Sequence, residues 1–315
     1  GIREGGAKTD ALAIDWALKL DAKEEEKPVL MALKIAQMIE TRRNLFYSKF
    51  PGYCHWKTGR LHSTVNQCQA NTRRSSESSP NKQQLGKRQG PDGKTPKFRE
   101  VIVPHHKDAL VVSLDESSQE LRILADYSKD SAMLSCFVGE DKRDRHNLTG
   151  LGIAKSRYPQ EGWSYEAFAK AYKSPQDPLH SAAFQGRILG KTVNFSAIYG
   201  IMAKKLGERM LVEESEAQVF LDAREKAFPE AEAWKAKVTE EAKNTGTVRT
   251  MEGAVRHLRA ALNSSDAYEA SKADRQAPSF MIQSSAAEMI KKAMCTMWRE
   301  GLLFKYDCEF IGAIH

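Results

Sequence analysis

Four side chains recur at a constant spacing of four residues within segment 186–200: Arg187, Lys191, Phe195 and Tyr199. On an α-helix four residues turn by about 400°, so these side chains drift slowly along one face and form a stripe about 18 Å long. The two cations can both reach a polyphosphate, and the rings beyond them can stack on a sugar or a base. Any two of these residues would also fit an amphipathic helix with solvated cations. All four in order favour a site that handles nucleotides.

Transfer of a nucleotidyl group would require a second set of side chains. Divalent ions must hold the attacking and leaving oxygens, and carboxylates must hold the ions. Asp115 is the candidate ligand, because it ends the apolar run 109–114, which predicts a buried strand. A lone aspartate at the end of a strand is more often a helix cap, and the stripe at 187–199 is what favours the metal-ligand interpretation. The five cysteines are scattered without a CxxC pair, which argues against a zinc site and a disulfide framework.

The elements that must position these residues follow from the hydrophobic periodicity, which predicts an α+β chain. Helices are expected over 12–20, 28–47, 119–133, most of 163–244 and 266–299, the last interrupted near Pro278. Strands are expected over 59–66, 109–115 and 305–314, with a short hairpin over 246–258. Strand regions that carry carboxylates therefore flank a large helical insertion.

The composition narrows the class of protein. The 315 residues carry 48 Lys and Arg against 41 Asp and Glu, a net charge of +7, and 41% of them are hydrophobic. That apolar share excludes global disorder, and no run approaches the ~18 apolar residues of a membrane span. Residues 1–4 do not begin a signal peptide, so we expect a cytoplasmic protein without a membrane partner. The basic segment 72–107 is either a solvated loop or a segment that contacts phosphates.

The stripe and six further segments, in order over nearly the whole chain, resemble the motifs of family A DNA polymerases, the bacterial DNA polymerase I group. The stripe is similar to the fingers-helix motif, and segment 114–122 is similar to the first palm motif. The other similar segments are Lys57-Thr58-Gly59-Arg60-Leu61-His62, 73–84, Asp144-Arg145-His146, 275–283 and Ile314-His315.

A second candidate for the first palm motif is Asp126-Tyr127-Ser128, which is identical to the Asp-Tyr-Ser of the family motif, whereas Asp115-Glu116-Ser117 differs from it at the second residue. Five residues after Asp126 stands Ser131, where the motif requires a glutamate, whereas Asp115 has Glu120 at that spacing. We therefore assign the motif to Asp115 and expect Asp126 to be exposed on or just after the following helix.

The resemblance implies an α+β right-hand polymerase fold with an antiparallel palm sheet, helical fingers and a partial helical thumb. It divides the chain into a partial thumb at 1–60, the first part of the palm at 61–125, fingers at 126–261 and a truncated second part of the palm at 262–315. In the family, the second catalytic carboxylate directly follows the histidine that His315 matches. The chain is therefore expected to be a fragment that is inactive alone.

The implied activity is template-directed DNA synthesis, in which dNTPs transfer nucleotidyl groups to a primer 3′-hydroxyl with two Mg²⁺ ions, or Mn²⁺ in their place. Asp115 would bind both ions, and Glu116 would add its backbone carbonyl. Glu120 would exclude a ribose 2′-hydroxyl. His146, Arg187 and Lys191 would bind the triphosphate, and Lys191 would also donate a proton to the leaving pyrophosphate. Phe195 would pack against the sugar, and Tyr199 would stack near the templating position.

The implied partners are primer–template DNA and dNTPs, and a processivity factor is a further partner that the sequence leaves open. The DNA contacts would be Arg73, Asn81, Gln83, Arg275, Ser279, Gln283 and His315, although Ser279 stands where the family usually has asparagine. The sequence Ser118-Gln119-Glu120-Leu121-Arg122 in the first palm motif resembles phage members of the family more than bacterial ones. The expected location of the protein is therefore the cytoplasm of a bacterial cell or of a phage-infected bacterium. Two alternatives stay open: a non-catalytic DNA-binding protein, and a single-subunit RNA polymerase, against which Glu120 and Phe195 argue.

Overall fold

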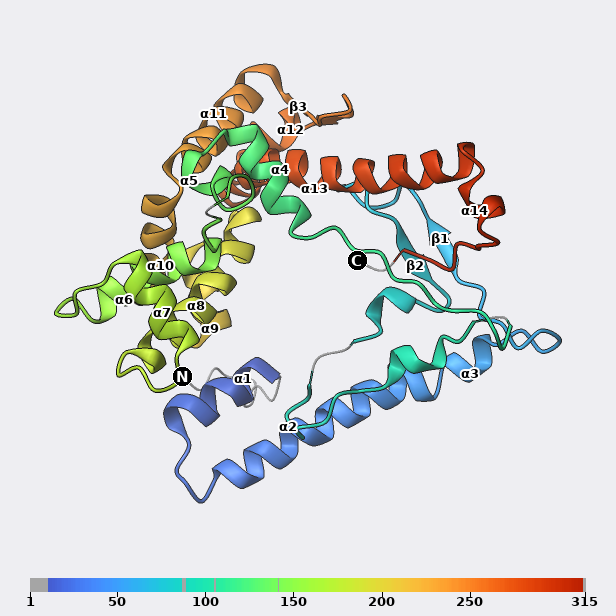
Figure 1. The fold of residues 1–315 in the computed structure, drawn as a ribbon, viewed down its shortest axis with the longest axis horizontal. Coiled ribbons are helices and arrows are strands. Elements are labelled where there is room, and N and C mark those ends of the chain that lie inside the picture. The colour runs from blue at the N-terminus through green and yellow to red at the C-terminus, as the bar shows by residue number, and fades with distance from the viewer. Residues whose placement is uncertain (1–10, 87–88, 105, 141, 314–315) are drawn as a thin grey trace. The chain divides into compact units, whose positions relative to one another are not determined.

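The computed structural model describes residues 11–86, 89–104, 106–140 and 142–313, and it divides into two compact units. We call Gly1–Asp115 with Gly301–His315 the N-terminal unit, and Glu116–Glu300 the helical unit. Figure 1 shows the elements of both. His315, a predicted DNA contact, lies outside the described residues. The division into thumb, palm and fingers stays a prediction.

Helices of the N-terminal unit lie mainly at its start. They are α1 (Ala11–Trp16), which continues as the π-helical η1 (Ala17–Asp21), α2 (Lys27–Arg42), which continues as η2 (Arg43–Tyr47), α3 (Phe50–Tyr53) and, late in the chain, α14 (Leu302–Lys305). Pro28 stands in the first turn of α2, where its missing N–H costs no hydrogen bond. The helix predicted over 28–47 is thus confirmed. A small core of Phe46, Leu85 and Phe98 packs beside it, with the two rings 4.4 Å apart.

The sheet of the N-terminal unit is short. Strands β1 (Thr64–Asn66) and β2 (Ser76–Ser78) pair antiparallel with Val65 opposite Glu77, so only the end of the strand predicted over 59–66 forms. The 3₁₀ turns η3 (Lys82–Gln84) and η4 (Phe98–Val101) follow.

Two predicted strands are absent from this structure. Residues 109–115 are exposed irregular chain, with Leu110 87% and Leu114 79% exposed, and no strand forms over the described part of 305–314. The buried strand expected to deliver Asp115 is therefore a wrong prediction. The physical reason is pairing: no described strand lies beside either run, and a lone strand leaves its backbone N–H and C=O groups without ladder partners.

The helical unit contains most of the helices. They are α4 (Gln119–Ser128), α5 (Ser131–Leu134), α6 (Arg145–Arg157), α7 (Tyr165–Lys173), α8 (His180–Ile198), α9 (Ala203–Met210), α10 (Glu214–Ala227), α11 (Pro229–Thr245), α12 (Arg259–Leu262) and α13 (Ala267–Arg299). Strands β3 (Thr247–Arg249) and β4 (Val255–His257) form the predicted hairpin, with Val248 opposite Arg256. The helix predicted over 119–133 breaks at Lys129, whose φ is 54°.

The longest helix, α13, runs through Pro278 without the predicted interruption (Figure 1). Proline has no N–H to donate to the carbonyl four residues earlier, which belongs to Asp274. The hydroxyl of Thr239 on α11 lies 3.3 Å from that carbonyl and 3.0 Å from the Lys235 carbonyl of its own helix, so its single proton is shared between the two acceptors. A side chain from a neighbouring helix thus partly replaces the lost backbone donor.

Four hydrophobic clusters lie among the described residues of the helical unit, and two of them contain the most buried residues. One joins α4, α5, α11 and α13 around Leu124, Met133, Phe228 and Ile282, and the other packs α8, α9 and α10 around Val193, Leu206 and Phe220. Asp126 is exposed on α4 beside Lys129, as predicted. None of the helices in the described ranges is both long and apolar enough to cross a membrane.

Candidate functional site

Helix α8 carries the predicted stripe. Arg187, Lys191 and Phe195 lie on α8, and Tyr199 is the residue that caps its C-terminus. The opposite side of the helix is buried through Ala183, Gly186, Gly190, Val193 and Ala197, whereas Lys191, Phe195 and Tyr199 are exposed. The helix therefore presents the stripe outward while its small residues face the interior.

Glycines bring α6 directly against α8. A Cβ added at Gly190 would lie 2.7 Å from the backbone N of Gly150 and from the backbone O of His146, and a Cβ at Gly186 would lie 2.9 Å from Gly150 O. Such distances are too short for any side chain, so the two helices touch backbone to backbone. This close crossing brings the start of α6, with Asp144 and His146, beside the cationic end of the stripe.

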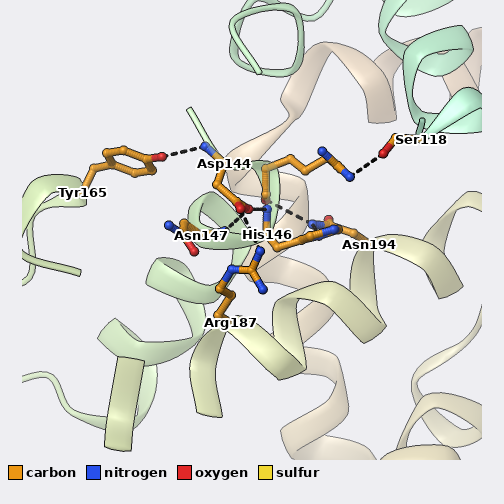
Figure 2. Close-up of polar contacts among 8 residues, drawn as sticks. Ser118, Asp144, His146, Asn147, Tyr165, Arg187 and Asn194 are labelled. Carbon is orange, nitrogen blue, oxygen red and sulfur yellow. Dashed lines mark hydrogen bonds and ion pairs between the residues drawn. The ribbon is translucent and has the colours of Figure 1, made fainter. Parts of the chain in front are cut away.

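Asp144 joins the two helices through its carboxylate (Figure 2). One oxygen accepts from the backbone N–H of His146 at 2.7 Å and of Asn147 at 3.1 Å, which caps the N-terminus of α6. The other oxygen accepts from Arg187 Nη2 at 2.8 Å. Burial alone would raise the pKa of Asp144, but the Arg187 guanidinium and the two N–H donors outweigh burial and hold it below its usual value. Asp144 is thus a fixed anion.

His146 is a neutral base within this arrangement. Its ring is 4% exposed, and its Nδ1 accepts from Asn194 Nδ2 at 3.2 Å. Asn194 is oriented in turn, because its Oδ1 accepts from the Thr149 hydroxyl at 2.9 Å and its Nδ2 also donates to the Arg145 carbonyl at 3.1 Å. Burial, followed by the charge of Arg145, lowers the pKa of His146 to about 4. At neutral pH the ring therefore keeps its proton on Nε2 and can donate one hydrogen bond.

The two cations of the stripe differ in their surroundings. Arg187 is held by Asp144, and its guanidinium lies 4.7 Å from the centre of the Tyr172 ring. Lys191 is exposed, and it makes no hydrogen bond or ion pair with any residue that the structure describes. A bound anion would meet a positioned guanidinium and a mobile ammonium one turn away.

The aromatic end of the stripe contacts the start of α4. The Tyr199 hydroxyl donates to Glu120 Oε2 at 2.7 Å, and the Phe195 ring lies 5.6 Å from the His146 ring. The structure therefore gathers Glu120, His146, Arg187, Phe195 and Tyr199, with Lys191 on the same helix. These residues are five of the six side chains predicted to surround a nucleotide, apart from the metal ligands.

The predicted DNA contacts on α13 lie in one row at four-residue spacing. Arg275 packs its aliphatic stem against Gly200, where a Cβ would lie 3.0 Å from it, and Gly200 has a φ of +66° that suits glycine. Gln283 Nε2 donates to Ser279 Oγ at 2.9 Å. The row thus starts beside the aromatic end of the stripe.

The predicted DNA contacts of the N-terminal unit lie around η3. Asn81 caps this turn by accepting from the Gln83 N–H at 3.0 Å, and Gln83 Nε2 donates to the carbonyls of Ser75 at 3.0 Å and Ala313 at 3.2 Å. Arg73 is exposed with a φ of 59°. The amide of Gln83 therefore holds the loop in shape.

The predicted metal ligands, Asp115 and Glu116, are both exposed and adjacent in the chain. Hard divalent cations need several oxygen ligands, and two ions need more than one carboxylate. Among the residues described here, no three His, Cys, Asp or Glu side chains come together to hold a metal ion. The described residues thus do not by themselves form a complete two-ion site.

Sequence reasoning did not find Asn194 and Thr149, which orient His146. A usable signal was present, because Gly186, Gly190 and Asn194 recur every four residues on the buried side of α8. A polar residue on such a face must find a buried partner. That requirement would have marked Asn194 as a candidate.

Comparison of folds supports a polymerase domain. The chain is similar to a structure described as the POL domain of Pol1 from M. smegmatis in complex with DNA primer-template and dNTP, with a TM-score of 0.65 and 24% identity over 95% of this chain and 47% of that one. The right-hand polymerase fold expected from the sequence is thus confirmed. The model of DNA polymerase family A matches residues 4–315, and the chain belongs to that family.

Sequence relatives agree with this family. The thermostable DNA polymerase I of Thermus thermophilus is 30% identical over 282 residues, which cover 90% of this chain and 30% of that protein. DNA polymerase I of Bacillus subtilis is 31% identical over 238 residues, which cover 76% of this chain and 24% of that protein. The chain therefore spans less than a third of the length of these relatives.

Proposed function

We propose that the chain belongs to an enzyme that synthesises DNA on a template, by transferring nucleotidyl groups from dNTPs to a primer 3′-hydroxyl. The observation that supports this most is the outward stripe of α8, with fixed phosphate-binding groups at one end and the Tyr199–Glu120 contact at the other. The structural neighbour was solved with DNA primer-template and dNTP, which agrees with the same ligands here.

Each side chain of the stripe has a role in this proposal. Arg187 and Lys191 bind the triphosphate, and neutral His146 donates its Nε2 proton to a phosphate oxygen. Lys191, the exposed cation, can also donate a proton to the departing pyrophosphate. A triphosphate would compete with Asp144 for Arg187, so nucleotide binding would weaken the ion pair between Arg187 and Asp144.

Glu120 and Phe195 select the sugar. Glu120 is held toward the stripe by Tyr199 and would exclude a 2′-hydroxyl by volume, while the Phe195 ring, beside His146, would pack against the sugar. We further propose that Asp115, with the backbone of Glu116, contributes to a Mg²⁺ site, and that Arg73, Asn81, Gln83, Arg275, Ser279 and Gln283 contact the primer–template duplex.

The test is single-nucleotide incorporation by the full-length protein with dNTP, rNTP and ddNTP. Glu120→Ala should raise rNTP use relative to dNTP use, because space opens for the 2′-hydroxyl. Phe195→Tyr should raise ddNTP use alone, because its hydroxyl replaces the missing 3′-hydroxyl. A parent enzyme that prefers rNTPs would instead support a single-subunit RNA polymerase.

A second candidate function is DNA binding without catalysis, and the lack of an assembled acidic cluster among the described residues favours it for this chain alone. Asp115→Ala distinguishes the two. In a catalytic protein it should abolish Mg²⁺-dependent extension and leave DNA affinity nearly unchanged. An unchanged extension rate would refute the role of Asp115.

A further inference from the structure

The C-terminal turn of α8 is held from outside by a lysine. Lys235 on α11 donates from Nζ to the backbone carbonyl of Ala197 at 2.9 Å. The same carbonyl accepts the Gly200 N–H at 3.1 Å, which ends the helix. The Lys235 side chain is 13% exposed, so this hydrogen bond is largely shielded from water. A shielded hydrogen bond to a helix end fixes the direction in which the chain leaves the helix.

Lys235 is part of a buried charge cluster, formed by Asp130, Arg224, Glu232 and Lys235. Glu232 Oε1 lies 2.9 Å from Lys235 Nζ and also pairs with Arg224 on α10, whose side chain is 2% exposed. Asp130 is fully buried and accepts from the backbone N–H of Met133 and of Ala231. Burial and the neighbouring Arg224 lower the pKa of Lys235, and its nitrogen can donate to Ala197 with or without the extra proton.

Such a cluster is a poor way to gain stability. Removing the charges of Asp130, Arg224 and Lys235 from water costs several kcal/mol per ion, although Glu232 stays 28% exposed. Well-packed apolar residues of similar size often stabilise a core as well or better. Two donors of Arg224, Nε and Nη2, have no acceptor among the described residues. A cluster that is costly and incompletely satisfied is better explained by geometry that it imposes on its neighbours.

The neighbour with the most direct consequence is Tyr199. It follows Ala197 by two residues, and its backbone N–H donates to Ser196 in the same turn. Its hydroxyl then donates to Glu120 at 2.7 Å. The position of the Ala197 carbonyl therefore determines where the Tyr199 ring can hold Glu120.

We propose that Lys235 is a positioning residue for sugar selection: its Nζ fixes the last turn of α8 and, through Tyr199, the placement of Glu120. Lys235 touches no substrate. The proposal rests on the proposed DNA polymerase function, because it assigns Lys235 to the selectivity of that site.

The first experiment compares Lys235→Met with the parent, both as full-length protein. Methionine is also unbranched, is one heavy atom shorter, and lacks the donor. The measured quantity is kcat/KM for a dNTP divided by kcat/KM for the matching rNTP, in which the fraction of folded enzyme cancels. We expect this ratio to fall by roughly three- to tenfold, the loss of one net hydrogen bond. Lys237→Met is the matched control, because Lys237 is exposed on the same helix and pairs with Glu241 on that helix. Its ratio should stay at the parental value.

The second experiment separates positioning from stability. The triple variant Arg224→Leu/Glu232→Leu/Lys235→Met removes both ion pairs of Glu232 together and leaves Asp130 with its two backbone N–H donors, so its melting temperature should exceed that of Lys235→Met. We expect its dNTP/rNTP ratio to stay low. Recovery of the parental ratio together with stability would show a purely structural role and overturn the proposal, as would a parental ratio in Lys235→Met.

A third measurement does not depend on polymerase activity. Hydrogen exchange of the Gly200 amide, which shares the Ala197 carbonyl, should accelerate in Lys235→Met and not in Lys237→Met. Unchanged exchange refutes the positioning role even in an active enzyme. If the parent incorporates no dNTP while this exchange does accelerate, then the proposed function fails and the role of Lys235 in holding the turn stands.

Discussion

Protonation of His146 should couple the stability of the helical unit to pH. The ring is buried and accepts at Nδ1, so its pKa is about 4 in the folded protein against 6.5 for a free histidine. Between pH 4 and pH 6.5, His146 is therefore neutral in the folded protein and protonated in the unfolded protein. Stability from this group is complete above pH 6.5 and is lost as the pH falls toward 4. The difference of 2.5 units corresponds to about 3 kcal/mol.

The assay is urea unfolding of the parent and of His146→Gln between pH 7 and pH 4.5. Glutamine does not titrate, so the difference in unfolding free energy between parent and variant should shrink by about 2–3 kcal/mol over this range. The comparison cancels the carboxylates that titrate in both proteins. A constant difference for His146→Gln would mean that the folded protein accommodates the charged ring, and would refute the reasoning.

Three further predictions concern packing and capping, all measured by chemical unfolding. Gly190→Ala should cost about 1–3 kcal/mol because its Cβ meets the backbone of α6, whereas Gly162→Ala, with open space around it, should stay within about 0.5 kcal/mol. Asp144→Asn keeps the α6 cap and loses the half-exposed ion pair, so it should cost about 1 kcal/mol or less, and Asp144→Ala about 1 kcal/mol more; equal costs would contradict the capping role. Thr239→Val should cost about 1 kcal/mol in the parent and less in a Pro278→Ala background, where alanine restores the N–H; equal costs would contradict the rescue of the Asp274 carbonyl.

Local patterns were sufficient to predict several elements. The spacing of Arg187, Lys191, Phe195 and Tyr199 predicted α8 and its exposed face, because a helix fixes which residues share a side. Turn residues around Gly246 and Gly253 predicted the β3–β4 hairpin in the same way. The motif Asp144-Arg145-His146 stands at the start of α6, and its role in nucleotide binding stays a prediction.

Features that depend on a distant partner could not be predicted. The apolar run 109–114 shows a need for burial but does not say which strand would pair with it, and no described strand does. The helix was predicted to break at Pro278 because the sequence does not show that the Thr239 hydroxyl of another helix lies beside the free Asp274 carbonyl. The links from Lys235 to Ala197 and from Asn194 to His146 also join residues far apart in the chain, which no periodicity reveals.

The backbone contact between α6 and α8 has a consequence for the entropy of ligand binding. Helices whose glycines interlock cannot slide past each other without separating, so the two move as one rigid body. Asp144 and His146 belong to the start of α6, and Arg187 belongs to α8. A polyanion that bound here, as proposed, would therefore meet His146 and Arg187 already arranged relative to each other, and mainly the exposed Lys191 would lose freedom on binding. Such preorganisation lowers the entropic cost of association and leaves more of the contact energy available as affinity.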